Sequence, residues 1–271
     1  MCMTNRACVG VVMNIKMIAV DLDGTLLRDD KTISDITIST LRKCRDRGIK
    51  VVYATARGNC AEHLISPDLV DGYVRMNGAV AYADDTPVHK KFMSSADVRD
   101  FLISANKANI QIAAEQSGWT YANFTFPEDW DPIFRSYYEI SDFRTLDVEI
   151  EKIWAMPKSE AEIEVLKAHL PEGLYLVTTR DDYFTMIMHE EASKSKAIAA
   201  LAEHWGIKST EIAAFGDDII DIDMLQHCGI GVAMENAIDE VKTVADYICD
   251  TNENDGVAKW IEEYVLSNRD G

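Results

Sequence analysis

Residues 16–27 constrain the fold more than any other stretch of the sequence. They form a short apolar run, Met17–Val20, then two aspartates one residue apart, Asp21 and Asp23, and then Gly24. An apolar run of β-forming residues that ends in Asp and Gly predicts a buried strand followed by a tight turn. Ligands bind at the carboxyl ends of strands in open α/β sheets, so we expect a functional site here. An ordinary Asp-Gly turn is the alternative.

The composition indicates a globular protein with a strongly acidic surface. The 271 residues are 47% hydrophobic and carry a formal net charge of −19. This length suits one large or two modest domains. The negative field repels the phosphates of nucleic acids and anionic lipids, so we expect neither as a partner. An anionic substrate must therefore be attracted by local cations.

The cysteines and the N-terminal segment indicate a cytoplasmic protein. The six cysteines contain no CxxC pair and have irregular spacings, which is typical of reduced thiols and not of a disulfide framework or a zinc site. No apolar run approaches the roughly 18 residues of a membrane span. Residues 1–14 make a poor signal peptide, and we expect them to form a loose extension.

A strand–helix–strand unit opens the chain. Residues 35–47 predict a helix that Ser34 caps, with Ile36, Ile38 and Leu41 near its apolar face. Residues 49–55 predict the second strand, which ends at a threonine.

The pattern changes after a short helix over 61–69 and a hairpin that turns at Asn77-Gly78. Residues 84–188 alternate amphipathic helices with short strands, two of them around Ser117-Gly118, and are enough for a separate α+β domain. Its aromatic residues are expected in the core and not in a ligand cage. They are Trp119, Tyr121, Trp130, Phe134, Tyr137, Tyr138 and Trp154.

The α/β alternation then resumes with a helix over 194–204, strands over 212–215, Ile230–Met234 and Tyr247–Cys249, and a closing helix over 256–266. We therefore predict a Rossmann-like, doubly wound parallel sheet with an inserted α+β domain. The expected boundaries are 1–83 and 189–271 for the α/β core and 84–188 for the insertion.

Residues that can bind ions or phosphate recur at the strand ends and helix starts of this core. They are Asp21, Asp23, Thr55, Lys194, Asp217 and Asp221. Asp217 and Asp221 are four residues apart, so one helical turn would place them on one side. Asp218 between them is expected to cap a helix instead. Thr55 alone could equally be an ordinary strand-end threonine.

Electrostatics favours a bound cation near these residues. A lysine at a helix start opposes the helix dipole, so Lys194 is best explained by nearby anions, whereas Lys196 is expected to be solvated. Four carboxylates in one pocket would carry four negative charges, of which Lys194 offsets one, and such charges do not all ionise cheaply. Oxygen ligands favour a hard divalent ion, and Mg²⁺ is the usual one beside phosphate.

The sequence resembles the haloacid dehalogenase (HAD) superfamily of phosphohydrolases, in particular the Cof-type branch with a class IIB cap. The stretch DLDGTLL, the strand-end Thr55, Lys194 and the stretch GDDIID are similar to the four motifs of that superfamily, in that order. The cap of this branch is inserted between the second and third motifs. VAMENA and NENDGVAKWI also resemble the C-terminal pattern of the branch.

This resemblance implies a phosphatase that acts on a small phosphorylated metabolite. Asp21 would be the nucleophile that forms an aspartyl-phosphate. Asp23 would protonate the leaving oxygen and then activate water. Thr55 and Lys194 would bind the phosphoryl oxygens and stabilise the transition state.

The resemblance also implies a Mg²⁺ ion, held by Asp21, the backbone carbonyl of Asp23, and Asp217, with Asp221 in support. The substrate would touch residues on both sides of the site. The candidates are Arg57 and Asn77 in the core and, more weakly, Arg180 in the cap, and each could instead be an ordinary surface or turn residue.

The chain departs from the family pattern at three positions. Ile220 stands where the family commonly has Asn, and Ala56 and Ser195 stand where it has Gly. A phosphomutase with the same intermediate and a catalytically weak binding protein, which Ile220 favours, stay open as alternatives. A signalling receiver is disfavoured, since receivers carry the phosphorylated Asp on a later strand and lack such an insertion.

Overall fold

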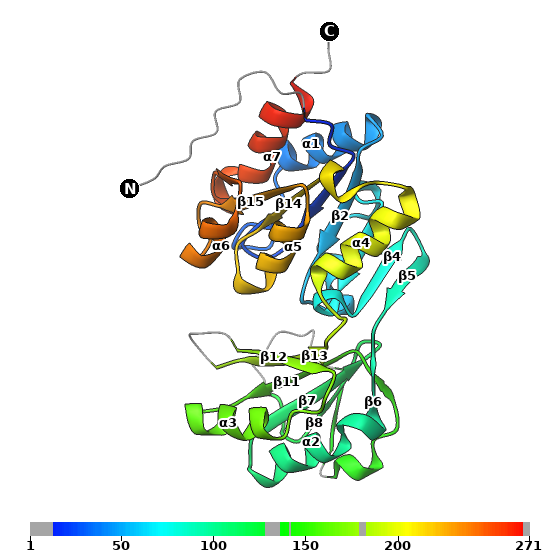
Figure 1. Cartoon of the computed structure of the whole chain (residues 1–271), viewed down its shortest axis with the longest axis vertical. Coiled ribbons are helices and arrows are strands. Elements are labelled where there is room, and N and C mark those ends of the chain that lie inside the picture. The colour runs from blue at the N-terminus through cyan, green and yellow to red at the C-terminus, as the bar shows by residue number, and fades with distance from the viewer. Residues whose placement is uncertain (1–12, 128–135, 141, 179–182, 268–271) are drawn as a thin grey trace. The chain divides into compact units, whose positions relative to one another are not determined.

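The structure is a computed structural model that describes residues 13–127, 136–140, 142–178 and 183–267 (Figure 1). The chain forms two compact units, Met1–Val51 with Ile207–Gly271, and Val52–Gly206. We call them unit 1 and unit 2. No helix in the described residues is long and apolar enough to span a membrane.

An eight-stranded sheet has the order β16-β15-β14-β1-β2-β3-β4-β5. Its strands are β1 (Met17–Val20), β2 (Lys50–Ala54), β3 (Gly72–Arg75), β4 (Val80–Ala83), β5 (Thr86–Lys90), β14 (Ile212–Gly216), β15 (Ile230–Met234) and β16 (Tyr247–Cys249). The pairs β1–β14, β14–β15, β15–β16 and β2–β3 are parallel, while β4 and β5 continue antiparallel. The predicted Rossmann-like core is confirmed, with a hairpin at one edge.

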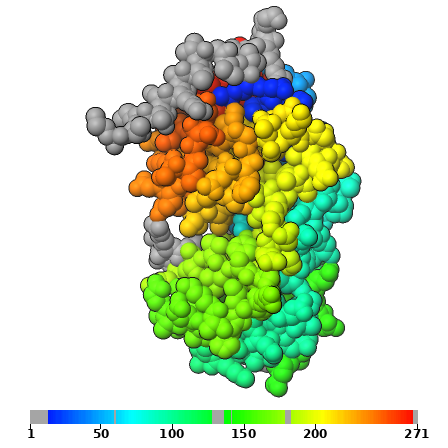
Figure 2. Space-filling model, in the orientation of Figure 1, coloured from blue at the N-terminus to red at the C-terminus, as the bar shows by residue number. Residues whose placement is uncertain are grey.

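The helices of unit 1 are α1 (Asp35–Asp46), α5 (Ile222–His227), α6 (Asp239–Val244) and α7 (Gly256–Ile261). Helix α1 packs with α7, and α5 packs with α6. Ser34 caps α1 as predicted. Leu41 is buried as predicted, but the face of α1 was predicted wrongly at Ile36, which is 60% exposed, because Thr37, Thr40 and Cys44 turn inward instead. In Figure 2 the orange C-terminal part of this unit lies beside its dark blue N-terminal segment.

Unit 2 begins within β2 and differs from the prediction at residues 61–69. Two short 3₁₀ turns, Asn59–His63 and Pro67–Leu69, replace the expected helix. Proline lacks an N–H and pushes the preceding residue out of the helical region, and Ser66 is indeed extended at ψ 132°. The predicted turn at Asn77-Gly78 is confirmed, with φ of 51° and 101°.

A six-stranded sheet, ordered β12-β13-β11-β7-β8-β9, forms the inserted part of unit 2. Its strands are β7 (Gln111–Gln116), β8 (Trp119–Ala122), β9 (Tyr137–Glu139), β11 (Lys152–Met156), β12 (Leu174–Thr178) and β13 (Thr185–His189). Two short strands, β6 (Met93–Ser94) and β10 (Glu149–Ile150), pair separately. The helices of unit 2 are α2 (Ser95–Lys107), α3 (Glu160–Ala168) and α4 (Lys194–Trp205).

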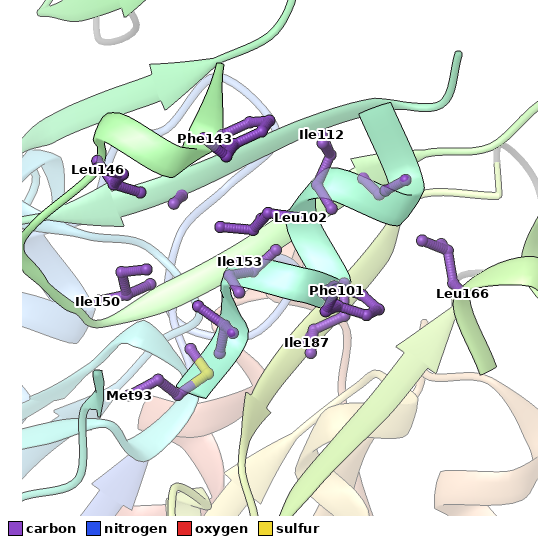
Figure 3. Packing of buried hydrophobic residues seen from close by; sticks show 14 of the residues in the cluster. Met93, Phe101, Leu102, Ile112, Phe143, Leu146, Ile150, Ile153, Leu166 and Ile187 are labelled. Atoms are coloured by element: carbon purple, nitrogen blue, oxygen red, sulfur yellow. The ribbon is translucent and has the colours of Figure 1, made fainter. Parts of the chain in front are cut away.

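The helix α2 presents its predicted apolar face to this sheet. Val98, Phe101, Leu102 and Ala105 are buried, and Phe101 and Leu102 pack in one cluster with Ile153, Leu166 and Ile187 (Figure 3). The insertion therefore has a core of its own. Its boundaries at 84 and 188 stay a prediction, since the two compact units divide the chain elsewhere.

Two of the aromatic residues predicted to lie in the core are exposed instead. Trp119 and Tyr138 are 42% and 51% exposed and stack with ring centroids 4.9 Å apart. They lie on β8 and on β9, and β9 is the last strand in the order of the six-stranded sheet. Trp154 is buried as expected, whereas Trp130 and Phe134 lie outside the described residues.

Candidate active site

Three aspartates of unit 1 meet where β1 and β14 end. Asp21, Asp217 and Asp221 each offer a carboxylate oxygen, and these oxygens all lie within 4.8 Å of one another. Asp21 follows β1 and Asp217 follows β14, which are neighbouring parallel strands with Val20 opposite Phe215. The carboxyl ends of parallel strands meet at one sheet edge, so the topology itself brings these side chains together.

The third carboxylate belongs to a turn that it also stabilises. Asp221 is fully buried and accepts hydrogen bonds from the backbone N–H groups of Asp217 and Asp218, at 3.0 and 3.2 Å. Asp218 caps the turn by accepting from Ile219 N–H at 2.7 Å, which confirms its predicted capping role. The amides fix Asp221 in place, so its carboxylate is held rigidly beside Asp217.

Two glycines make room for these carboxylates. A Cβ on Gly24, whose φ is +74°, would lie 2.3 Å from Oδ2 of Asp217, and a Cβ on Gly216 would lie 2.4 Å from Cβ of Asp221. Any side chain there would displace an aspartate. The close packing of the two glycines was not predicted, although a glycine directly beside each acidic motif is a signal of it.

Thr25 and Asn236 make hydrogen bonds that stabilise the acidic cluster and the turn at Gly24. Neither residue was predicted to have a role. Thr25 is buried, and its hydroxyl donates to Oδ1 of Asp217 at 2.7 Å. Asn236 donates from Nδ2 to the carbonyl oxygen of Gly24 at 2.7 Å. The motif DGT contains Thr25 and the motif VAMENA contains Asn236, so these motifs could have indicated both residues.

Asp23 lies apart from the three clustered carboxylates. Its side chain is about one third exposed and forms an ion pair with Lys31, with Oδ1 2.7 Å from Nζ. A partly exposed aspartate can exchange protons with solvent, which suits a general acid or base.

The donor set of the cluster fits a hard divalent cation. Three carboxylates whose oxygens lie this close repel one another when ionised, and two of the three, Asp21 and Asp221, are buried. Carboxylate oxygens are the ligands that Mg²⁺ takes in proteins. The cluster therefore meets the chemical requirement that the sequence analysis set for a metal site.

A second group of predicted residues lies in unit 2, around Thr55. Thr55 is buried, its backbone N–H donates to Val74 at 2.9 Å, and its carbonyl accepts from Asn77 N–H at 3.0 Å. The backbone N–H of Arg57 donates to the Thr55 hydroxyl oxygen at 3.1 Å. Hydrogen bonds thus link the turn after β2, which holds Thr55 and Arg57, to Asn77 in the turn after β3.

Lys194 is the first residue of α4 and is fully buried. Ser193 caps this helix, and Gly78 packs so tightly on Ser193 that a Cβ there would lie 2.2 Å from its backbone. The helix start and the Asn77-Gly78 turn are therefore in direct contact. Burial of an ammonium group is costly without anions or acceptors, in keeping with the charge argument for Lys194. Lys196 pairs with Glu191 at the surface, as expected.

A buried charged group beside the Thr55 turn was not foreseen. Lys152 of β11 donates to the carbonyl of Ala56 at 3.0 Å and pairs with Glu115 of β7 at 3.2 Å. Burial raises the pKa of the neighbouring Glu151, and the charge of Glu115 adds to this effect. The alternation of core and surface residues along a strand does not indicate which residues on other strands or turns each side chain will contact.

The structure thus places the predicted site residues in two groups, one in each unit. Asp21, Asp217 and Asp221 form the first, and the Asp23 carboxylate lies outside that cluster; Thr55, Arg57, Asn77 and Lys194 form the second. Their catalytic and binding roles stay predictions. Arg180 lies outside the described residues.

Comparison with known proteins identifies the family. Residues 18–261 match the family model of the haloacid dehalogenase-like hydrolases. The chain is 32% identical to the 5-amino-6-(5-phospho-D-ribitylamino)uracil phosphatase YcsE of Bacillus subtilis, over 94% of this chain and 97% of that protein.

Solved structures agree with this match. A HAD phosphatase from Bacteroides thetaiotaomicron is 29% identical with a TM-score of 0.80, covering 96% of this chain and 98% of that one. A HAD subclass IIB sugar phosphatase is 25% identical with a TM-score of 0.76, covering 92% and 98%. The predicted superfamily is confirmed: the chain belongs to the haloacid dehalogenase-like hydrolases.

Proposed function

We propose that this protein hydrolyses small phosphate monoesters with Mg²⁺ and forms an aspartyl-phosphate on Asp21. The observation that carries the proposal is the cluster of Asp21, Asp217 and Asp221 at the ends of β1 and β14. The family match and the names of the relatives support phosphatase chemistry. The substrate class is a sugar phosphate, a nucleotide or a pyridoxal phosphate, and the YcsE name makes a phosphorylated ribityl compound the first ester to test.

In the first step a carboxylate oxygen of Asp21 attacks the phosphorus atom, and the bond from phosphorus to the leaving oxygen breaks. Asp23 gives its proton to that oxygen, so the alcohol leaves neutral. The product is a phosphoryl group on Asp21, a recognised form of covalent catalysis.

In the second step water attacks the phosphorus of the aspartyl-phosphate. Asp23, now ionised, takes a proton from this water, and the bond from Asp21 to phosphorus breaks. Inorganic phosphate leaves, and both aspartates return to their starting protonation states. One residue thus serves as acid and then as base.

The remaining residues bind and orient the reacting groups. Asp21, the backbone carbonyl of Asp23, and Asp217 would hold Mg²⁺, with Asp221 in support; the ion supplies positive charge against the phosphoryl oxygens. Thr55 and Lys194 bind phosphoryl oxygens, and the burial of Lys194 strengthens its interaction with an anion. Arg57 and Asn77 contact the rest of the ester.

Phosphate release from a panel of esters, with and without Mg²⁺, tests the proposal. The panel includes 5-amino-6-(5-phospho-D-ribitylamino)uracil, a hexose phosphate, a nucleotide and pyridoxal phosphate. We expect Mg²⁺-dependent release that falls at least about a thousandfold in Asp21→Asn, since removal of a catalytic nucleophile commonly costs this much. Asp85→Asn, which alters an exposed aspartate of a turn, should keep full activity.

Two outcomes would reject the proposal. Phosphate release that persists in Asp21→Asn would rule out an aspartyl-phosphate on Asp21. Absence of release from every ester would favour the binding protein or a phosphomutase, and transfer of phosphate between two sugar hydroxyls would identify the latter. If no ester releases phosphate, Ile220→Asn, which introduces the side chain common in the family, becomes the next variant.

A further inference from the structure

Tyr175, a residue of β12, connects two parts of the second site group. Its hydroxyl oxygen lies 3.0 Å from Nδ2 of Asn77 and 2.7 Å from the carbonyl oxygen of Ala192. Ala192 comes two residues before Lys194 in the sequence. One phenol therefore contacts both the Asn77 turn and the segment that leads into α4.

The chemistry of these three groups fixes the direction of both hydrogen bonds. A phenol has one hydrogen, and a backbone carbonyl only accepts. The Tyr175 hydrogen is therefore donated to Ala192, and the Tyr175 oxygen accepts from Asn77. It follows that Asn77 directs its NH₂ group toward Tyr175 and its carbonyl oxygen, Oδ1, away from it.

This carbonyl oxygen is a buried acceptor. Asn77 is 4% exposed, and Oδ1 has no hydrogen-bond partner among the residues that the structure describes. The backbone cannot easily turn to find one, since Asn77 is left-handed at φ 51° and its N–H donates to Thr55 at 3.0 Å. Buried acceptors are rarely left unsatisfied in folded proteins, so this atom points to a ligand that donates.

We propose that Tyr175 is a positioning residue that orients the Asn77 amide, so that Oδ1 accepts a hydrogen bond from a hydroxyl or amino group of the substrate. This inference rests on the proposed function and narrows its substrate class. The enzyme prefers esters whose alcohol carries further donors, such as polyol phosphates, over esters without a donor, such as phenyl phosphate. The preference arises at Asn77, and Tyr175 of β12 maintains it by orienting the Asn77 amide.

Equilibrium binding to the Asp21→Asn protein with Mg²⁺ tests this inference without requiring turnover. The probes are D-ribitol 5-phosphate and phenyl phosphate, each titrated by calorimetry. Addition of Tyr175→Phe should weaken ribitol phosphate binding about tenfold, the equivalent of one hydrogen bond. Phenyl phosphate binding should change less than about twofold. Tyr138→Phe, which removes an exposed hydroxyl on β9, should change neither.

A second pair of variants separates positioning from a loss of structure. Asn77→Gly removes the amide and tolerates the left-handed backbone, so it should lose the same preference for ribitol phosphate. If Tyr175 acts through Asn77, Tyr175→Phe added to Asn77→Gly has no further effect on the ratio of the two dissociation constants. A preference that survives Asn77→Gly overturns the inference, even if Tyr175→Phe does not fold.

The inference is also overturned if Tyr175→Phe weakens the binding of both probes equally, so that the ratio of their dissociation constants is unchanged. Failure of both probes to bind overturns it as well. The proposed function is judged separately by phosphate release from the wild-type protein. A ribitol phosphate preference without any phosphate release would reject the proposed function and leave the inference intact.

Discussion

At the scale of single residues, the acidic cluster depends on the two residues Gly24 and Thr25. Gly24 leaves the space in which the Asp217 carboxylate lies, and Thr25 donates a hydrogen bond to the same carboxylate. Mutation of residues that orient metal-binding side chains typically weakens metal affinity about 10–100-fold. The turn after β1 therefore supplies both a candidate nucleophile and the support for a carboxylate on another strand.

Gly24→Ala should weaken Mg²⁺ binding by about 10–100-fold, as changes beside metal ligands commonly do. The added Cβ would lie 2.3 Å from Oδ2 of Asp217, so the carboxylate must move. Gly48→Ala is the matched control, since its φ of +76° imposes similar backbone strain with no atom within 4 Å. Mg²⁺ titration and thermal unfolding of both variants separate the two effects. Equal Mg²⁺ affinities would show that the contact with Asp217 is unimportant.

At the scale of helices and strands, the sequence predicted most elements because their signals are local. Ser34, Gly206 and the turn at Ser117-Gly118 lie where capping and turn preferences place them. Misses occurred where a tertiary contact or a single residue decided the outcome, as at Pro67 and the exposed Ile36.

The candidate site divides in the same way. Motifs indicated the aspartates, because Asp21 with Asp23, and Asp217 with Asp221, each lie within one short stretch of the chain. Tyr175 and Lys152 gave no signal, because their contacts with Asn77 and Ala56 join residues 98 and 96 positions apart in the chain.

Ser34→Ala should lower the free energy of unfolding by about 1 kcal/mol, the usual contribution of a serine N-cap. The Ser34 hydroxyl accepts from the backbone N–H of Thr37 at 3.0 Å, and alanine leaves that donor without its partner. Ser39→Ala removes the same hydroxyl from an exposed position inside α1, where alanine favours the helix, so stability should be unchanged or slightly higher. Urea unfolding measures both, and equal losses would contradict the capping role.

At the scale of the whole molecule, acidic charge is abundant on the surface and selectively placed inside. The net charge is −19, yet the structure buries Glu151 beside the charged residues Glu115 and Lys152. Burial raises the pKa of Glu151 above its ordinary value of 4.5, and the Glu115 charge adds to this. The folded chain therefore binds the Glu151 proton more tightly than the unfolded chain does.

This difference predicts how stability varies with pH. A raised pKa contributes stability fully below the ordinary value of 4.5, and the contribution is lost as pH rises through the raised pKa. Glu151→Gln, which cannot ionise, should therefore gain stability relative to wild type as pH rises from 4 to 8. Thermal unfolding across this range measures the gain. Glu203→Gln on the exposed face of α4 is the control, and parallel profiles for the two variants would contradict the prediction.

The pairing of β1 with β14 has a consequence for how the protein is made. Thr25 and Asp217 are 192 residues apart in the chain, yet their side chains share a hydrogen bond. A ribosome delivers the first strand long before its neighbour exists, so this strand must wait at the edge of an unfinished sheet. Such distant pairings slow folding and leave apolar strands open to wrong partners. The acidic cluster is therefore completed late in synthesis, and a nascent chain that stops within the insertion cannot form it.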